Sequence, residues 1–241
     1  MRSVVVLPTY NEAGNIDAML RAIRDAAPTT DILVVDDNSP DGTGRLAEET
    51  GDDIGRIDVL HRPGKEGLGS AYREGFGKVL GSYDVVVSMD ADFSHDPRQI
   101  VDFIAEVERG ADLVIGSRYV AGGGTADWPL RRRLLSRWGN AYTRTVLRVP
   151  ARDCTSGYRA YRAEALHAID PTSTSAEGYA FLTELVRRMA RRGAVVVEVP
   201  ITFRDRTNGT SKMSGRIIVE SMLLVTRWGV ADLVNAIRRR R

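Results

Sequence analysis

Short apolar runs alternate with amphipathic stretches along most of this chain of 241 residues. The runs are rich in valine, isoleucine and leucine and have few polar interruptions, which is typical of strands that are buried on both faces. The stretches between them repeat apolar residues at helical spacing. This alternation predicts an α/β fold: a single domain with a Rossmann-like, mostly parallel sheet flanked by helices.

Six strands are expected, at Val4–Leu7, Ile32–Val35, Ile57–Leu60, Val85–Met89, Leu113–Ile115 and Val195–Val199. The expected helices between them are Ala13–Ala26, Gly42–Thr50, Leu68–Leu80 and Pro97–Arg109. Asp96 is well placed to cap the last of these helices, and Pro97 suits its first turn.

The composition excludes several classes of protein. Apolar residues make up 43% of the chain and charged residues 27%, which suits a packed core and excludes disorder for most of the length. Cys154 is the only cysteine, so no internal disulfide can form and we expect a reducing compartment. We expect no signal peptide, because a strand-like run begins at Val4, and no membrane-spanning helix, because no apolar run reaches about 18 residues.

Charge is unevenly distributed along the chain. Of the 34 basic residues only Lys65, Lys78 and Lys212 are lysines, and arginines cluster at 131–144, 187–192 and 238–241. Acidic residues concentrate in the first 112 positions. The asymmetry suggests a metal-binding part followed by a part that meets phosphate or a membrane surface. General arginine enrichment on solvated faces is the alternative.

Ligands of open α/β sheets bind beyond the carboxyl ends of the strands. In this chain these ends are 8–15, 36–43, 61–69 and 90–96, and three of the four are rich in carboxylates. Crowded carboxylates are unfavourable unless a cation or a donor-rich ligand lies among them. These four loops are therefore the expected site.

The strongest signal is Asp90-Ala91-Asp92, directly after a predicted strand. In extended chain, residues two apart point to the same side, so both carboxylates can face one divalent cation. Capping or turn formation is the alternative, but Asp36 and Asp37 at another strand end favour a binding site. Neither a GxGxxG motif after the first strand nor a GxxxxGK[ST] loop is present, which argues against dinucleotide oxidoreductases and P-loop enzymes.

The sequence resembles a known family over Val4 to about Gly215. The matching segments are PTYNEAGNI, VVDDNSPDGT, RPGKEGLGSAYREGF, DADFSHDP, GSRYV, TSGYRAYR and ITFRDRTNGTSKMS. Together they are similar to the family 2 inverting glycosyltransferases of the GT-A fold, and within these to the polyprenol-phosphate (dolichol-phosphate) mannose synthases.

The resemblance implies roles for particular residues. Nucleoside contacts fall on Pro8, Tyr10, Glu12, Val35 and Asp37, and the metal and diphosphate motif on Asp90, Ala91 and Asp92. Many relatives have glutamine where this chain has Ser94, so the third metal ligand is Ser94 or a water. Basic contacts to the donor diphosphate or the acceptor phosphate fall on Arg118, Arg206 and Lys212. The positions that hold the lipid phosphate fall on Arg132 and Ser136.

The expected chemistry needs no general base. The second pKa of a phosphate monoester is near 6, so a lipid phosphate is largely dianionic at neutral pH and is already a nucleophile. Asp92 would serve a Mg²⁺ or Mn²⁺ ion, while Arg118 and Arg132 would orient the attacking oxygen. Glu177, Tyr179 and Glu184 fall where this fold places sugar-side or acceptor-side groups.

Two segments suit a membrane surface. Trp128–Arg148 has apolar residues at helical spacing with interleaved arginines, and Ile217–Ile237 is apolar but broken by charges. Docking of either helix on the protein's own core is the alternative. We expect a catalytic domain over residues 1–215 and an amphipathic, basic C-terminal helix over 216–241.

The expected activity is transfer of mannose from GDP-mannose to a polyprenyl phosphate, at the cytoplasmic face of a membrane or beside a membrane-anchored partner protein. The alternatives are a UDP-glucose-dependent transfer to the same acceptor, a nucleotidyltransferase, and a non-catalytic protein that binds anionic lipid. Nucleic-acid binding is not expected, because no known module is present and the cleft is acidic.

Overall fold

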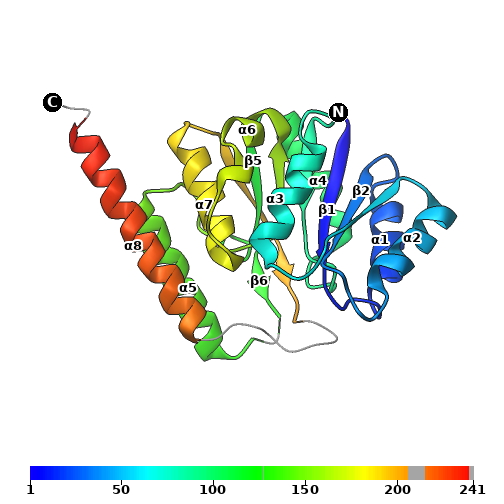
Figure 1. Cartoon of the computed structure of the whole chain (residues 1–241). Coiled ribbons are helices and arrows are strands. Elements are labelled where there is room, and N and C mark those ends of the chain that lie inside the picture. The colour runs from blue at the N-terminus through cyan, green and yellow to red at the C-terminus, as the bar shows by residue number, and fades with distance from the viewer. Residues whose placement is uncertain (127, 206–214, 239–241) are drawn as a thin grey trace.

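The fold is given by a computed structural model that describes residues 1–126, 128–205 and 215–238, without the side chains of residues 179, 216–218, 236 and 237. A seven-stranded sheet lies at its centre, with the strand order β3-β2-β1-β4-β7-β5-β8 (Figure 1). Its strands are β1 (Ser3–Thr9), β2 (Asp31–Asp36), β3 (Ile57–His61), β4 (Val85–Ser88), β5 (Leu113–Ser117), β7 (Arg159–Arg162) and β8 (Val196–Pro200).

All the expected strands are present, with ends that differ by one or two residues. Strand β7 was not predicted, and it runs antiparallel to both neighbours, β4 and β5. The other pairings in this sheet are parallel, so the predicted mostly parallel sheet is confirmed. A separate two-stranded parallel ribbon pairs β6 (Gly124–Thr125) with β9 (Thr202–Phe203).

The expected helices are present, and the structure adds α6 and α7. The helices are α1 (Ile16–Ala26), α2 (Thr43–Ile54), α3 (Leu68–Val79), α4 (Ile100–Glu108), α5 (Leu130–Leu147), α6 (Ala163–Ala168), α7 (Gly178–Arg191) and α8 (Gly215–Arg238), with short 3₁₀ turns η1 (Pro97–Gln99) and η2 (Pro171–Ser173). Helix α1 starts later than predicted, because the N–H groups of Asn15 and Ile16 both bond to the Glu12 carbonyl in a preceding turn. The predicted cap is confirmed: the Asp96 carboxylate accepts from the Arg98 N–H at 3.0 Å.

Alternate residues of each strand face two separate cores. Val4 and Val6 of β1 pack with α3 and α7, whereas Val5 and Leu7 pack with α1 and α4. Because both faces are covered, the central strands are apolar without alternation, as predicted. The carboxyl ends of the parallel strands lie at one end of the sheet.

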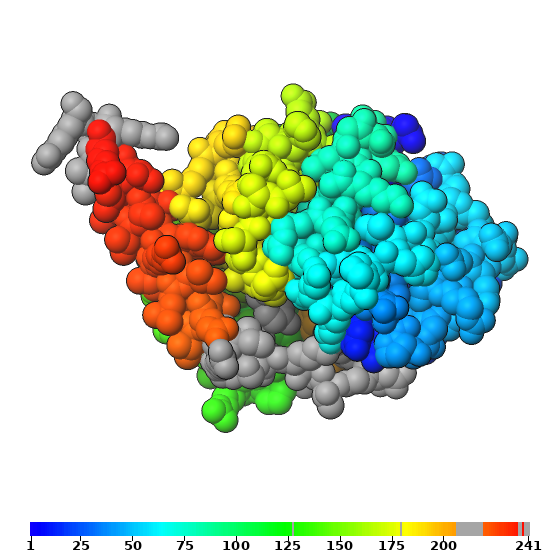
Figure 2. Space-filling model, in the orientation of Figure 1, coloured from blue at the N-terminus to red at the C-terminus, as the bar shows by residue number. Residues whose placement is uncertain are grey.

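Helix α8 lies alongside α5 at one edge of the molecule (Figures 1 and 2). The hydroxyls of Tyr142 and Thr226 are 2.7 Å apart, and Asp232 binds Arg187 of α7. Gly229 lies so close to α5 that a Cβ atom there would be 2.5 Å from the Val146 side chain. The C-terminal helix is thus docked on the rest of the domain. The boundary at residue 215 stays a prediction.

Candidate functional site

The loops after β1 and β2 are hydrogen-bonded to each other at the carboxyl edge of the sheet. The Asp37 N–H donates to the Thr9 carbonyl at 3.0 Å, and the Thr9 hydroxyl donates to the Asp36 carboxylate at 3.0 Å. The Glu12 N–H donates to the Thr43 hydroxyl at 2.9 Å. These bonds join two of the loops that the sequence predicted to form the site.

Asp37 is held by an arginine that the sequence analysis did not single out. The Asp37 carboxylate, 6% exposed, forms an ion pair with Arg62, whose side chain is fully buried. Arg62 also lies 3.0 Å from a Glu74 carboxylate oxygen and donates to the Ser70 hydroxyl at 2.5 Å. Arg62 therefore fixes the orientation of Asp37 for a ligand at this edge.

The remaining predicted nucleoside contacts lie on β1, on β2 and in the loop that follows β1. Lys65 Nζ lies 3.8 Å from the centre of the Tyr10 ring, a cation–π contact. Glu12 accepts from the Asn15 side-chain amide at 2.9 Å. Pro8 is in register with Val35 across β1 and β2. Val35 is fully buried in the core, so it supports the strand and reaches a ligand only if its neighbours move.

The acidic motif follows β4 at the same edge. Asp92 is 3% exposed, Ala91 equally buried, and the Asp90 side chain 34% exposed. The Ser94 hydroxyl and N–H both donate to Asp92 Oδ1, at 2.5 and 3.1 Å. Ser94, predicted as a possible metal ligand, is thus already engaged in orienting Asp92.

A buried histidine lies beside this motif. The His95 side chain is 1% exposed, and neither of its ring nitrogens has a hydrogen-bond partner in the described part of the chain. Its Nε2 atom is 3.5 Å from Asp90 Oδ2. Carboxylate oxygens are the ligands that Mg²⁺ and Mn²⁺ prefer, so Asp90 and Asp92 are of the right chemistry for such a divalent cation. No group of three or more such side chains is close enough to form a complete site among the described residues.

Arg118 has an internal partner that the sequence did not predict. It donates to Asp153 through Nε and Nη2, each at 2.7 Å, and to the Thr155 hydroxyl at 2.8 Å. The exposed fractions of the Arg118 and Asp153 side chains are 7% and 0%. Burial alone would raise the pKa of the Asp153 carboxyl, but the charge and hydrogen bonds of Arg118 outweigh it and hold that pKa below its ordinary value.

Arg132 lies at the start of α5, more exposed than Arg118. Its Nη1 atom donates to both carboxylate oxygens of Asp205, at 2.8 and 3.0 Å, and the Trp128 indole N–H donates to the same carboxylate at 2.9 Å. The Arg132 guanidinium lies 3.9 Å from the centre of the Trp128 ring system. Ser136, one turn further along α5, accepts from the Tyr119 hydroxyl at 2.6 Å.

Phe203 of β9 joins the acidic motif to the arginines. Its ring centre lies 5.5 Å from those of His95 and Trp128, and 5.7 Å from the Arg118 guanidinium. The Arg204 N–H also donates to the Ser94 carbonyl at 3.2 Å. The structure thereby brings the predicted metal motif and the predicted phosphate-binding arginines to one place.

Other predicted residues are placed elsewhere or are not described. Arg206 and Lys212 lie outside the described residues, as does the Tyr179 side chain. Glu177 binds Arg73, and Glu184 accepts from Arg188 at 2.7 Å, so both make internal contacts. Burial raises the pKa of the Cys154 thiol to about 12, so at neutral pH it is protonated and is not a nucleophile.

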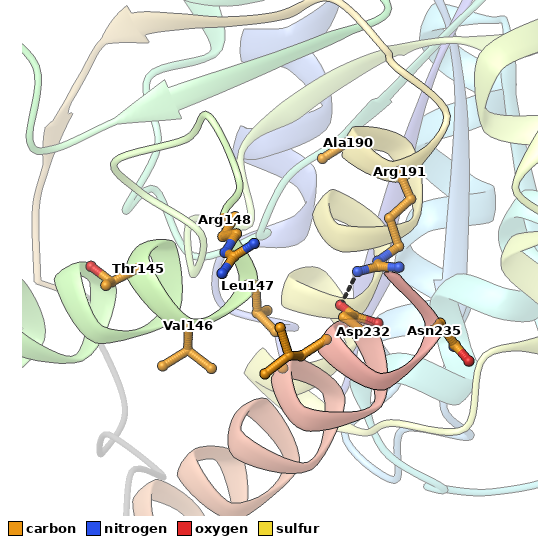
Figure 3. A pocket seen from close by; sticks show the side chains of 10 residues that line it. Thr145, Val146, Leu147, Arg148, Ala190, Arg191, Asp232 and Asn235 are labelled. Carbon is orange, nitrogen blue, oxygen red and sulfur yellow. Dashed lines mark ion pairs between the residues drawn. The ribbon is translucent and has the colours of Figure 1, made fainter. Parts of the chain in front are cut away.

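A cavity of about 650 Å³ lies between α5, α7 and α8, away from the acidic motif (Figure 3). Arg148, Arg191 and Asp232 point into it, and Arg191 is ion-paired with Asp232. None of the predicted site residues lines it. The cavity is thus separate from the candidate site.

Comparison with known proteins identifies the family of the chain. A family model described as "Glycosyl transferase family 2" matches residues 4–170. An "Undecaprenyl-phosphate mannosyltransferase" of Micrococcus luteus is 48% identical over 241 residues, covering 100% of this chain and 99% of that protein. A "Polyprenol monophosphomannose synthase" of Mycolicibacterium smegmatis is 47% identical over 239 residues, covering 98% of this chain and 90% of that protein.

A solved structure shares the fold. The glucosyl-3-phosphoglycerate synthase of Mycobacterium tuberculosis, in complex with Mn²⁺, UDP-glucose and phosphoglyceric acid, has a TM-score of 0.70 and 22% sequence identity. The match covers 93% of this chain and 80% of that one. At this identity the likeness bears on the fold alone, and it confirms the predicted arrangement of sheet and helices.

Proposed function

The chain belongs to glycosyl transferase family 2 and is a glycosyltransferase of the GT-A fold, and we propose that it transfers mannose from GDP-mannose to a polyprenyl phosphate with inversion. The observation that carries the proposal is the contact chain through Phe203, which joins Asp90 and His95 to Arg118 and Arg132. A cation-binding motif for a diphosphate and a cationic site for a phosphate then lie side by side. The names of two full-length relatives support the acceptor class.

On the donor side, Asp37 and Tyr10 would contact the nucleoside, and Arg62 would hold Asp37 in place. Asp90 and Asp92 would hold a divalent cation, Mg²⁺ or Mn²⁺, with His95 beside Asp90 and Ser94 supporting Asp92. When bound, such a cation neutralises the charge of the departing diphosphate. Arg206 and Lys212 are proposed to add to this neutralisation.

On the acceptor side, Arg132 and Ser136 would bind the phosphate and orient one of its oxygens toward the sugar carbon. This oxygen forms the new bond as the bond from the sugar to the nucleoside diphosphate breaks. The acceptor is already anionic, so no side chain need remove a proton. Arg118 is fixed by Asp153, so it would contribute a preorganised positive charge rather than a mobile contact.

The donor is tested by thermal unfolding in the presence of candidate sugar nucleotides. A ligand at about 100 times its Kd stabilises the folded state by about 2.7 kcal/mol, which raises the Tm of a domain of this size by roughly 5–10 °C. We expect this shift for GDP-mannose with Mn²⁺ or Mg²⁺, and a much smaller one for UDP-glucose or for either nucleotide in chelator. A larger shift with UDP-glucose would favour the alternative transferase, and no shift with any of the tested nucleotides would refute GDP-mannose as the donor.

We also propose that the chain acts peripherally at the cytoplasmic face of a membrane, on its surface or beside a membrane-anchored partner. Among the described residues no helix is long and apolar enough to span a bilayer. The N-terminal half of α5 exposes four large apolar residues, with exposed fractions between 41% and 59%: Leu130, Leu134, Leu135 and Trp138. Arg131, Arg133 and Arg137 are exposed among them. Such a surface suits an interface with anionic headgroups.

Flotation with vesicles tests this surface. We expect at least about tenfold stronger binding to vesicles with 30% anionic lipid than to zwitterionic ones, because each basic residue near the surface contributes about 1 kcal/mol. The Leu134→Asp/Trp138→Asp variant should lose the binding. Val101→Asp, at an apolar residue 47% exposed on α4, is the matched control and should float like the wild type. If neither lipid binds the wild type, the acceptor is reached through a partner protein instead.

A further inference from the structure

Arg118 and Arg132 both have internal carboxylate partners, but the environments of the two ion pairs differ. The pair of Arg118 and Asp153 is buried, and a charge removed from it would leave the other unpaired in the interior. The pair of Arg132 and Asp205 is partly open to solvent, with 28% and 43% of the side chains exposed. Only in the second pair can another anion replace the aspartate without leaving a buried charge unpaired.

The Asp205 carboxylate is held by Arg132 and Trp128 together. Its two oxygens accept from Arg132 Nη1 at 2.8 and 3.0 Å, and one of them also accepts from the Trp128 indole N–H at 2.9 Å. The Trp128 ring system lies against the Arg132 guanidinium at 3.9 Å and holds it in position. Two donors, one of them a cation, are thus arranged around a small oxyanion.

We infer that Asp205 is an internal anion that fills the Arg132–Trp128 site and is displaced by the acceptor phosphate. This inference rests on the proposed function. A phosphate dianion forms stronger charge-assisted hydrogen bonds with a guanidinium than a carboxylate does, and repulsion between the two anions prevents both from binding at once. Asp205 therefore lowers the affinity for acceptor and selects for dianionic phosphate over more weakly charged ligands.

Replacing Asp205 by asparagine tests the inference, because asparagine keeps the shape and removes the charge. Exposed ion pairs are weak, so we expect the KM for polyprenyl phosphate to fall by about two- to fivefold in Asp205→Asn, with the KM for the donor unchanged. Arg132→Ala should raise the acceptor KM, and adding Asp205→Asn to it should then have no further effect. Glu49→Gln, which removes a carboxylate from an exposed pair with Arg45 on α2, is the control and should change neither KM.

A binding measurement separates this inference from the proposed function. The Trp128 indole N–H signal in an NMR spectrum, assigned with Trp128→Phe, should shift on titration with a short-chain isoprenyl phosphate, at lower concentrations in Asp205→Asn than in the wild type. A wild type that transfers no sugar to polyprenyl phosphate would refute the proposed function, while this titration would still test the anion exchange. An equal or weaker phosphate affinity in Asp205→Asn would overturn the inference and assign Asp205 to positioning Arg132.

Discussion

The Asp90→Asn/Asp92→Asn variant will lose sugar transfer, with a turnover at least about 1,000-fold below that of the wild type. Both carboxylates follow β4 at the edge of the sheet, and Asp90 has 34% of its side chain open to solvent. Asparagine keeps the oxygen that accepts from Ser94, so the loop should stay folded. The loss would therefore arise from missing negative charge at the proposed cation site.

The measurement is transfer of labelled mannose from GDP-mannose to polyprenyl phosphate with Mn²⁺ or Mg²⁺. Chelator should reduce the wild type to the level of the variant, and the Tm of the two proteins without ligand should agree. Asp52→Asn, at an exposed carboxylate of α2, is the control and should retain full activity. Wild-type rates from the double variant in chelator would exclude a cation at this motif.

The Asp153→Ala variant will lose about 3–5 kcal/mol of unfolding free energy, because it leaves the Arg118 guanidinium buried without its carboxylate partner. This corresponds to a Tm lower by roughly 6–20 °C. The pair also predicts a pH dependence. The pKa of Asp153 is lower in the folded state than in the unfolded state, so its stabilisation is complete above the unfolded value of about 4 and is lost as the pH falls through the folded value.

Chemical denaturation between pH 3 and pH 7 measures both effects. The difference in stability between the wild type and Asp153→Ala should be largest at neutral pH and should shrink as the pH falls below about 4. Glu49→Ala removes one carboxylate of an exposed ion pair and should change the stability by less than about 0.5 kcal/mol. A loss below about 1 kcal/mol in Asp153→Ala would show that Arg118 finds another partner.

The strands visible from sequence are rich in apolar residues, and the inner ones among them, β1, β2, β4 and β5, are almost entirely buried. Strand β7 escaped prediction because its four residues begin and end with arginine. Arg159 is nevertheless fully buried, and it donates to the carbonyls of Ser156, Leu182 and Cys154, each at 2.7 Å. Two of these carbonyls belong to the loop just before the strand, but the third lies on α7. A local pattern does not reveal such partners.

The same limit applies to the site. The loops at the strand ends and the acidic motif were predictable, because their positions follow from the alternation of strands and helices. The partners Asp153 and Asp205 were not, since each meets its arginine across a long stretch of chain. The family motif that begins ITFRDR includes Phe203 and Asp205, so the sequence marked this segment as part of the site. Only the fold shows that these two residues lie between the acidic motif and α5. The roles of Arg206 and Lys212 stay predictions.

The reversed strand β7 also determines how the sheet can assemble. It is the only strand that joins β4 to β5 in the large sheet, and it lies more than 70 residues after β4 in the chain. As the chain leaves the ribosome, β1 to β4 can pair early, whereas β5 has no neighbour until residues 159–162 have been made. Until then β4 presents an open edge, and closing the intervening loop costs chain entropy. The four strands β1 to β4 therefore cannot be joined to β5 until this short, arginine-bounded strand has been made.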